Sequence, residues 1–275
     1  MLYRRGGLGD TIVTFPLLEL LKKSGKKVWA VGNTDYYAIA KEVGWADFIS
    51  SEIPQENFEG KIIISYEGNL KPFPEDRRWI LEYYIKSLNL RGEFSEILPI
   101  EPMRENPLEG FAVLHPSSGS RKKNPPLELF LRIEHFLRKE GFKTVYFVGE
   151  ADQWLKEHVK NYYESLYPLE IAKSLKGARL FVGLDSGISH LASYCGVPTF
   201  VFYGPTDPIV WKPIGKRVFK ISLNLTCSPC FPHVCEDRSC LQTEGLYRAF
   251  IKAYSNSTSL MCSTKGPLTT TTSKP

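Results

Sequence analysis

The sequence of 275 residues lacks an apolar run long enough to cross a bilayer, which takes about 20 consecutive residues. Its first ten residues hold two arginines and three glycines, where a secretory signal would carry an uninterrupted apolar segment. These two absences favour neither a membrane-spanning nor a secreted protein. We therefore expect a cytoplasmic protein whose membrane contact, if any, is peripheral and at the inner face.

A strong excess of either charge is also absent. The 35 basic and 30 acidic residues give a net charge of +5 and are dispersed along the chain. This balance is too mild to indicate a nucleic-acid partner, although a local basic cluster is still suited to an anionic small molecule. The hydrophobic content of 43% is that of a globular protein with a sizeable core.

Short apolar runs alternate with amphipathic stretches of helical period, a pattern typical of parallel βαβ units. The predicted strands cover residues 1–4, 27–31, 61–65, 111–115, 143–149, 178–183 and 198–204. The predicted helices cover residues 14–23, 36–43, 77–88, 127–139, 152–163, 169–175, 186–194 and 241–254. The fold class is therefore α/β.

A segment with three prolines, "LPIEPMRENPLEG", separates two such patterns and predicts a linker. We expect an N-terminal Rossmann-like domain at 1–100, a linker at 101–110 and a C-terminal Rossmann-like domain at 111–254. The Ser/Thr-rich residues 255–275 have no periodicity and predict a disordered tail.

Glycines and one acid follow the first predicted strand in "RRGGLGD", which includes Gly7, Gly9 and Asp10. Glycines permit close approach of a ligand to the backbone and expose N–H groups. The run is not a complete GxGxxG, so it is a weak nucleotide signal. Taken alone, Asp10 is better explained as a helix N-cap than as a catalytic group.

The loop "HPSSGSRKKNPP" combines Ser117 and Ser118 with a glycine and three cations that include Lys123. Hydroxyls, backbone N–H groups and ammonium groups beside a helix N-terminus suit a phosphate. A solvated basic turn explains the same residues about as well.

Two later loops carry acids at the ends of strands. In "VGEADQ", Glu150 and Asp152 are explained as ordinary helix caps, and the functional alternative is a carboxylate that holds ribose hydroxyls. In "VGLDSGISH", an N-cap does not explain Asp185 and Ser186 together with a glycine and an early histidine. This loop favours a functional site.

With these loops in this order, the sequence resembles glycosyltransferase family 9, the heptosyltransferases that use ADP-heptose to build the lipopolysaccharide core. The matching segments are "GGLGDTIVTFPLL", "HPSSGSRKKNPPLELF", "FVGLDSGISHLASYCGVPTFVFYGPTDP" and "CSPCFPHVCEDRSCL". The resemblance implies a GT-B fold, in which two Rossmann-like domains face each other across a cleft. It also implies an inverting transfer without a metal, in agreement with the absence of a DxD motif.

The resemblance further implies roles for individual residues. Asp10 matches the proposed general base, and Gly7 and Gly9 would let acceptor and donor approach its loop. The donor-binding matches are Ser117, Ser118, Lys123, Glu150, Asp185, Ser186, Gly187 and His190. The implied partners are a nucleotide-sugar donor, with ADP favoured, and a glycan or glycolipid acceptor. The N-terminal half is shorter than is usual in the family, so the acceptor is not implied in detail.

Four cysteines gather in one segment, at Cys227, Cys230, Cys235 and Cys240, with His233 between them. Such a cluster in a reducing compartment indicates a zinc or iron–sulfur site, but the usual pair of CxxC motifs is absent. A structural loop without metal is the favoured interpretation, and no cofactor is required.

Two further functions stay open besides a glycosyltransferase. One is a nucleotide-binding module without transferase activity, left by shortening of the acceptor domain. The other is an NAD-dependent oxidoreductase, which the Rossmann pattern permits although the full fingerprint is missing.

Overall fold

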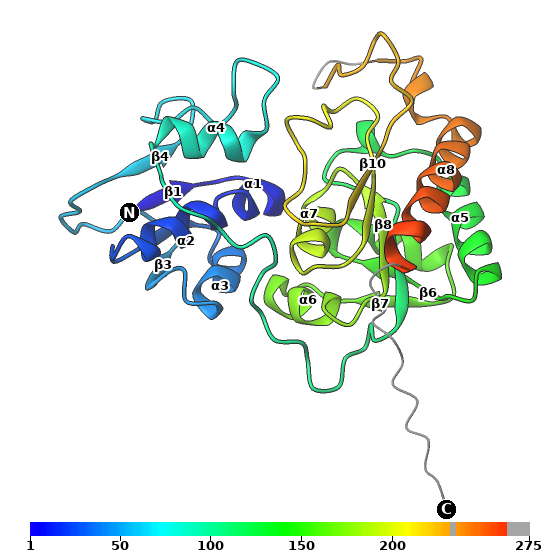
Figure 1. Ribbon diagram of the computed structural model, residues 1–275, viewed down its shortest axis with the longest axis horizontal. Helices are drawn as coiled ribbons and strands as arrows, with labels where there is room; N and C mark the ends of the chain where they lie inside the picture. Colours follow the sequence, from blue (N-terminus) through cyan, green and yellow to red (C-terminus); the bar gives the residue numbers. More distant parts are fainter. Residues whose placement is uncertain (232–234, 263–275) are drawn as a thin grey trace, which may run out of the picture.

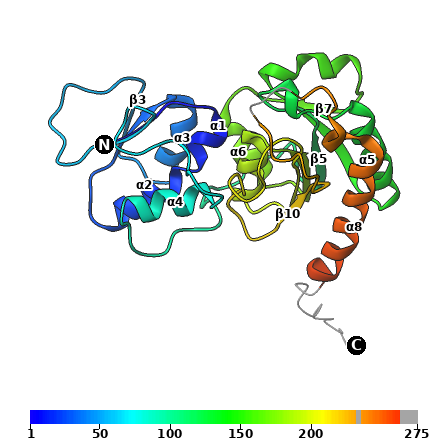
Figure 2. The same ribbon diagram turned by 90° about the horizontal axis from the view of Figure 1, so that it is seen from above.

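The computed structural model describes residues 1–231 and 235–262, which form two parallel sheets side by side. Figure 1 shows the first hundred residues on the left and the remainder on the right, and Figure 2 shows the same separation from above. We call these parts the N-half and the C-half. Within the described residues, no helix is both long and apolar enough to cross a membrane.

The sheet of the N-half has four parallel strands in the order β3-β2-β1-β4. They are β1 (Leu2–Arg4), β2 (Trp29–Gly32), β3 (Phe48–Ser50) and β4 (Ile62–Ile64). Its helices are α1 (Leu8–Ile12), α2 (Phe15–Lys23), α3 (Thr34–Glu42) and α4 (Ile80–Ser87). The side chain of Asn33 caps α3 by accepting from the backbone N–H groups of Asp35 and Tyr36, which fixes where this helix begins.

The sheet of the C-half has six parallel strands in the order β10-β9-β8-β5-β6-β7. They are β5 (Phe111–His115), β6 (Lys143–Val148), β7 (Tyr162–Glu164), β8 (Leu180–Leu184), β9 (Thr199–Phe202) and β10 (Val218–Ile221). The helices are α5 (Leu127–Lys139), α6 (Pro168–Leu175), α7 (Gly187–Tyr194) and α8 (Thr243–Cys262), with short 3₁₀ helices η1 (Arg121–Lys123), η2 (Glu150–Glu157) and η3 (Ser239–Leu241).

The two faces of the six-stranded sheet belong to different apolar cores. On β5, Ala112 and Leu114 point into a core with α5 and α8, whereas Val113 points to the opposite side, as the two-residue period of a strand requires. Figure 1 shows α5 and α8 on the outer side of the sheet, and α6 and α7 on the side of the N-half. The inner core is continuous with the N-half, since Leu191 and Tyr194 share it with Leu2.

The structure corrects three expectations about secondary structure. The helix predicted at 152–163 is the 3₁₀ helix η2 followed by strand β7, and strands β3 and β10 were not predicted. All three missed strands lie at sheet edges, where one side is exposed and an apolar run is not needed. The last helix continues to Cys262, eight residues beyond the predicted end at Tyr254, so part of the predicted tail is helical.

Candidate active site

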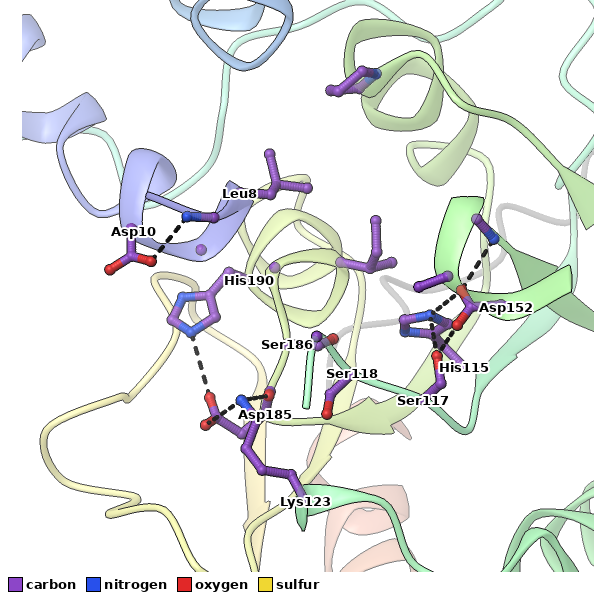
Figure 3. Close-up of a pocket in the computed structure, with 18 of the residues that line it drawn as sticks. Leu8, Asp10, His115, Ser117, Ser118, Lys123, Asp152, Asp185, Ser186 and His190 are labelled. Atoms are coloured by element: carbon purple, nitrogen blue, oxygen red, sulfur yellow. Dashed lines mark hydrogen bonds and ion pairs between the residues drawn. The ribbon is translucent and has the colours of Figure 1, made fainter. Parts of the chain in front are cut away.

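A cavity of about 530 Å³ opens between the halves, where loops leave the carboxyl ends of strands of both sheets. Ligands of parallel α/β sheets bind at this edge. Figure 3 shows its principal side chains. The lining includes every residue predicted for catalysis, donor binding or the acceptor-side loop: Gly7, Gly9, Asp10, Ser117, Ser118, Lys123, Glu150, Asp185, Ser186, Gly187 and His190.

Asp10 is the third residue of helix α1, and the N-cap is Gly7. The N–H of Gly7 donates to Asp10 Oδ2 at 3.0 Å, and the Arg4 guanidinium donates to Oδ1. The Asp10 side chain is 26% exposed, whereas Arg4 is buried beside it. The carboxylate therefore closes the first turn of α1, presents an exposed part to the cavity and is held by a buried cation.

Glycines let α1 and α7 approach each other closely. A Cβ atom on Gly187 would lie 2.6 Å from Leu8 Cβ and 2.9 Å from the Gly9 nitrogen, which forbids a side chain there without movement. A Cβ on Gly9 would in turn meet the Gly187 Cα at 3.5 Å. Both glycines line the cavity, and the close approach of the two helices requires a glycine at position 187, whereas a Cβ at position 9 would make only an ordinary contact.

Three side chains converge at the end of β8. Lys123 Nζ donates to the Asp185 carbonyl at 2.6 Å and lies 3.3 Å from Asp185 Oδ2. On the other side, His190 Nε2 lies 3.8 Å from Asp185 Oδ1. Burial alone raises the pKa of Asp185, but the nearby His190 and the charge of Lys123 outweigh it and the pKa is lowered. Asp185 is thus a buried carboxylate that fixes a lysine and a histidine at the cavity wall.

Ser186 is the N-cap of α7, because its Oγ accepts from the N–H of Ser189 at 3.4 Å. The helix therefore begins at the cavity, and its N-terminal dipole end points toward any bound anion. In the facing loop, Ser118 Oγ lies 2.7 Å from Asn124 Oδ1, which holds the turn that carries Lys123.

Ser117 belongs to a buried cluster with two residues that had not been predicted as functional. Its Oγ donates to Asp152 Oδ1, and His115 Nε2 lies 3.0 Å from Asp152 Oδ2. All three side chains are buried. The pKa of Asp152 falls to about 2, because hydrogen bonds from His115 and Ser117 and the His115 charge outweigh the effect of burial. Since the Ser117 hydroxyl proton is used inside the cluster, this side chain supports the loop rather than offering a donor to a ligand.

One signal in the sequence indicates this cluster. The spacing Gly7-x-x-Asp10 recurs as Gly149-x-x-Asp152, and both aspartates accept from the glycine N–H at 3.0 Å. A histidine at the end of the neighbouring strand β5 then meets the second aspartate.

Glu150 opens η2 at the cavity wall opposite Tyr36 of α3, and both line the cavity. Burial first, and then the negative charges of Glu150 and Asp35, raise the pKa of the Tyr36 phenol. Sequence reasoning missed Tyr36, since nothing in a helical pattern shows that one of its tyrosines reaches the opposite half.

The cysteine segment lies beside the cavity. Cys230, Cys235 and Cys240 line a separate recess, while Phe231 lines the main cavity with Lys123 Nζ 5.8 Å from its ring. In residues 1–231 and 235–262, no group of three or more His, Cys, Asp or Glu side chains is arranged to hold a metal ion. The alternative of a zinc site finds no support among the described cysteines, and His233 lies outside the described residues.

Comparisons with known proteins agree with this arrangement. The model of glycosyltransferase family 9 (heptosyltransferase) matches residues 101–240. A lipopolysaccharide heptosyltransferase 1 from Pseudomonas aeruginosa is 37% identical over 65 residues, which are 24% of this chain and 18% of that protein. The aligned part thus spans less than a fifth of this curated relative.

Two solved structures show the same fold at low identity. The E. coli heptosyltransferase WaaC with ADP has a TM-score of 0.66 and 17% identity, covering 92% of this chain and 98% of that one. The iron-containing heptosyltransferase TibC of enterotoxigenic E. coli, in complex with ADP-D-β-D-heptose, has a TM-score of 0.72 and 14% identity, covering 93% and 75%. The two parallel sheets are therefore those of the GT-B fold.

Proposed function

Because the chain belongs to glycosyltransferase family 9, we propose that it transfers a heptose or related sugar from a nucleotide-diphosphate donor to a glycan. ADP-heptose is the favoured donor, since structural neighbours are described with ADP and with an ADP-heptose. A lipopolysaccharide core is the favoured acceptor, because the curated relative is named a lipopolysaccharide heptosyltransferase. The observation that carries the proposal is one cavity that joins Asp10 of the N-half to the anion-binding loops of the C-half.

The donor diphosphate is assigned to the C-half part of this cavity. Lys123 supplies a fixed positive charge there, and Ser186 begins helix α7 at the same wall. Asp185 holds Lys123 in place through two hydrogen bonds, and the third ammonium hydrogen is left for the ligand. These groups stabilise the negative charge that develops on the departing nucleotide.

The acceptor is assigned to the N-half side. Phe73 lines both the main cavity and a second recess of about 240 Å³, which also includes Arg4, Arg5 and Tyr66. Because Arg4 contacts Asp10, this recess ends beside the carboxylate. A glycan that occupies it brings a hydroxyl toward Asp10, and a lipid-bound glycan would bring the protein to a membrane surface.

The proposed reaction is a single displacement. The Asp10 carboxylate accepts the proton of the acceptor hydroxyl, whose oxygen bonds to the anomeric carbon as the bond from that carbon to the phosphate oxygen breaks. The nucleoside diphosphate leaves with the electron pair, and the anomeric configuration inverts. We propose that no metal is required, because the sequence has no DxD motif and Lys123 supplies positive charge.

The test measures release of ADP from ADP-heptose in the presence of a lipopolysaccharide-core acceptor. We expect turnover by the wild type. In Lys123→Met the KM for the donor should rise about 10- to 100-fold, because the variant loses a hydrogen bond between charged groups. Lys122→Met is the matched control, since Lys122 lines the cysteine recess instead of the cavity, and its KM should stay within about twofold.

The outcomes separate this proposal from its alternatives. Binding of ADP without turnover of any nucleotide sugar would favour a nucleotide-binding module that lacks transferase activity. Equal donor KM values for the two lysine variants would contradict the assigned diphosphate site. Family membership replaces the NAD-dependent oxidoreductase hypothesis, for which the sequence lacks the full fingerprint.

A further inference from the structure

Tyr36 reaches the donor part of the cavity from the opposite half of the molecule. It lies in the first turn of α3, where its N–H donates to the Asn33 cap at 3.3 Å. The next residue, Tyr37, is fully buried, and its hydroxyl lies 3.3 Å from Thr14 Oγ1. A capped helix start and a buried neighbour hold the Tyr36 backbone in place, so its phenol is directed to the cavity by the fold of the N-half.

The wall that Tyr36 faces differs from the diphosphate wall. It is formed by the segments around the ends of β6 and β7. Its exposed carboxylate is Glu150, whereas Asp152 of the same loop is buried and bonded by His115 and Ser117. Beside Glu150 the lining is largely apolar, with Phe147, Leu166, Pro168 and Ile171. An apolar recess with one exposed acid suits a nucleoside, whose base packs against apolar side chains while its ribose hydroxyls donate to the carboxylate.

The phenol of Tyr36 complements this carboxylate. Both residues line the same cavity, and the Tyr36 hydroxyl is protonated at neutral pH like that of an ordinary tyrosine; burial first, and then the charge of Glu150, raise its pKa further. A protonated phenol both donates and accepts a hydrogen bond, whereas the carboxylate only accepts. Together they offer partners for two adjacent hydroxyl groups, which is the arrangement on a ribose.

We propose that Tyr36 is a donor-contacting residue whose hydroxyl binds the ribose of the nucleotide across the cavity from Glu150. This inference rests on the proposed function, because it assumes that a nucleotide occupies the cavity. The nucleotide then contacts both halves, at Lys123 of the C-half through its diphosphate and at Tyr36 of the N-half through its ribose. The residue selects ribonucleotides over deoxyribonucleotides rather than one base over another.

The test compares binding of a nucleotide that has ribose hydroxyls with one that lacks them. Calorimetry first identifies which of ADP, UDP and GDP binds the wild type most tightly, and the 2′,3′-dideoxy form of that nucleotide is then measured. We expect Tyr36→Phe to raise the Kd of the ribonucleotide about 3- to 10-fold, the value of one hydrogen bond, and to leave the Kd of the dideoxy form unchanged. Tyr162→Phe is the matched control, because Tyr162 lies on β7 outside the cavity lining.

Each outcome has a distinct meaning. Equal weakening of both nucleotides in Tyr36→Phe, or no weakening, overturns the ribose contact while the proposed function stands. Equal affinity of the wild type for the two forms overturns it as well. If none of the three nucleotides binds the wild type, the proposed function and this inference both fail.

Discussion

Asp10 and Asp152 occupy the same local position in the two halves of the molecule. Each is the third residue of a helix that follows a strand, and each accepts a hydrogen bond of 3.0 Å from the N–H of the glycine three residues before it. Their surroundings differ. The Asp10 side chain is 26% exposed and has a cation as partner, whereas that of Asp152 is 5% exposed and is bonded by His115 and Ser117.

The difference shows how one local motif serves two purposes. Both oxygens of each aspartate accept from protein groups, but Asp152 is enclosed by partners from two loops and holds together the loops after β5 and β6. Asp10 retains an exposed part that faces the cavity, where a substrate hydroxyl can reach it. The capping geometry is shared, and only the neighbours from other strands decide between a structural and a catalytic carboxylate.

The largest effect should come from Asp10→Asn. An amide still accepts from the Gly7 N–H but does not take up a proton, so kcat should fall about 100- to 10,000-fold, the usual contribution of a general base. The Kd for the donor nucleotide should change less than threefold, and the free energy of unfolding should fall by about 2 to 3 kcal/mol, because the buried Arg4 loses the charge that pairs with it. Single-turnover kinetics and urea unfolding measure these quantities. A kcat within tenfold of the wild type would remove the base role.

Asp152→Asn should instead lower the stability and weaken nucleotide binding, with little effect on kcat. The substitution removes the charge that His115 and Ser117 hold in a buried site, and breaking such a group costs about 3 kcal/mol of unfolding free energy. Because Ser117 supports the donor loop, the Kd of the nucleotide should rise while kcat at saturating donor changes little. Urea unfolding and nucleotide titration provide the measurements. A selective loss of kcat in this variant would contradict the proposal that Asp152 is structural and Asp10 is catalytic.

The smallest effect is the part that Asp152 contributes to the pH dependence of stability. Its pKa is about 2 in the folded protein against an ordinary value of 3.8, so the unfolded chain binds this proton more readily. The carboxylate stabilises the fold above about pH 4, and its contribution is lost as the pH falls toward about 2. Between pH 5 and pH 3 the wild type should lose about 1 kcal/mol more unfolding free energy than Asp152→Asn. Equal losses would show that the His115 contact does not lower this pKa.

The regular parts of the fold were predictable because they are encoded by local patterns. The amphipathic helix at 127–139 is confirmed as α5 with the same ends, and strand β5 is confirmed at Phe111–His115. The edge strands β3, β7 and β10 were not predicted, since a strand with one exposed side needs no continuous apolar run. The helix predicted at 152–163 was wrong for a related reason, because its apolar positions serve a 3₁₀ turn and then an edge strand.

The candidate site was predictable where chemistry and spacing coincide. The segment "LDSGISH" predicted that Asp185, Ser186 and His190 lie together, and the structure brings them to one wall of the cavity with Lys123. The cluster of His115 and Asp152 was missed, because its members come from different loops and a histidine at the end of a strand has no local signature.

The sequence by itself determined the α/β class, the loops that follow the strands and the residue types suited to an anion. Only the tertiary structure decided which carboxylate is exposed and which is enclosed, and which tyrosine crosses from one half to the other. The physical reason is that hydrogen bonding along the chain sets helix starts such as those at Gly7 and Gly149, whereas burial and charge pairing depend on groups that approach from distant segments.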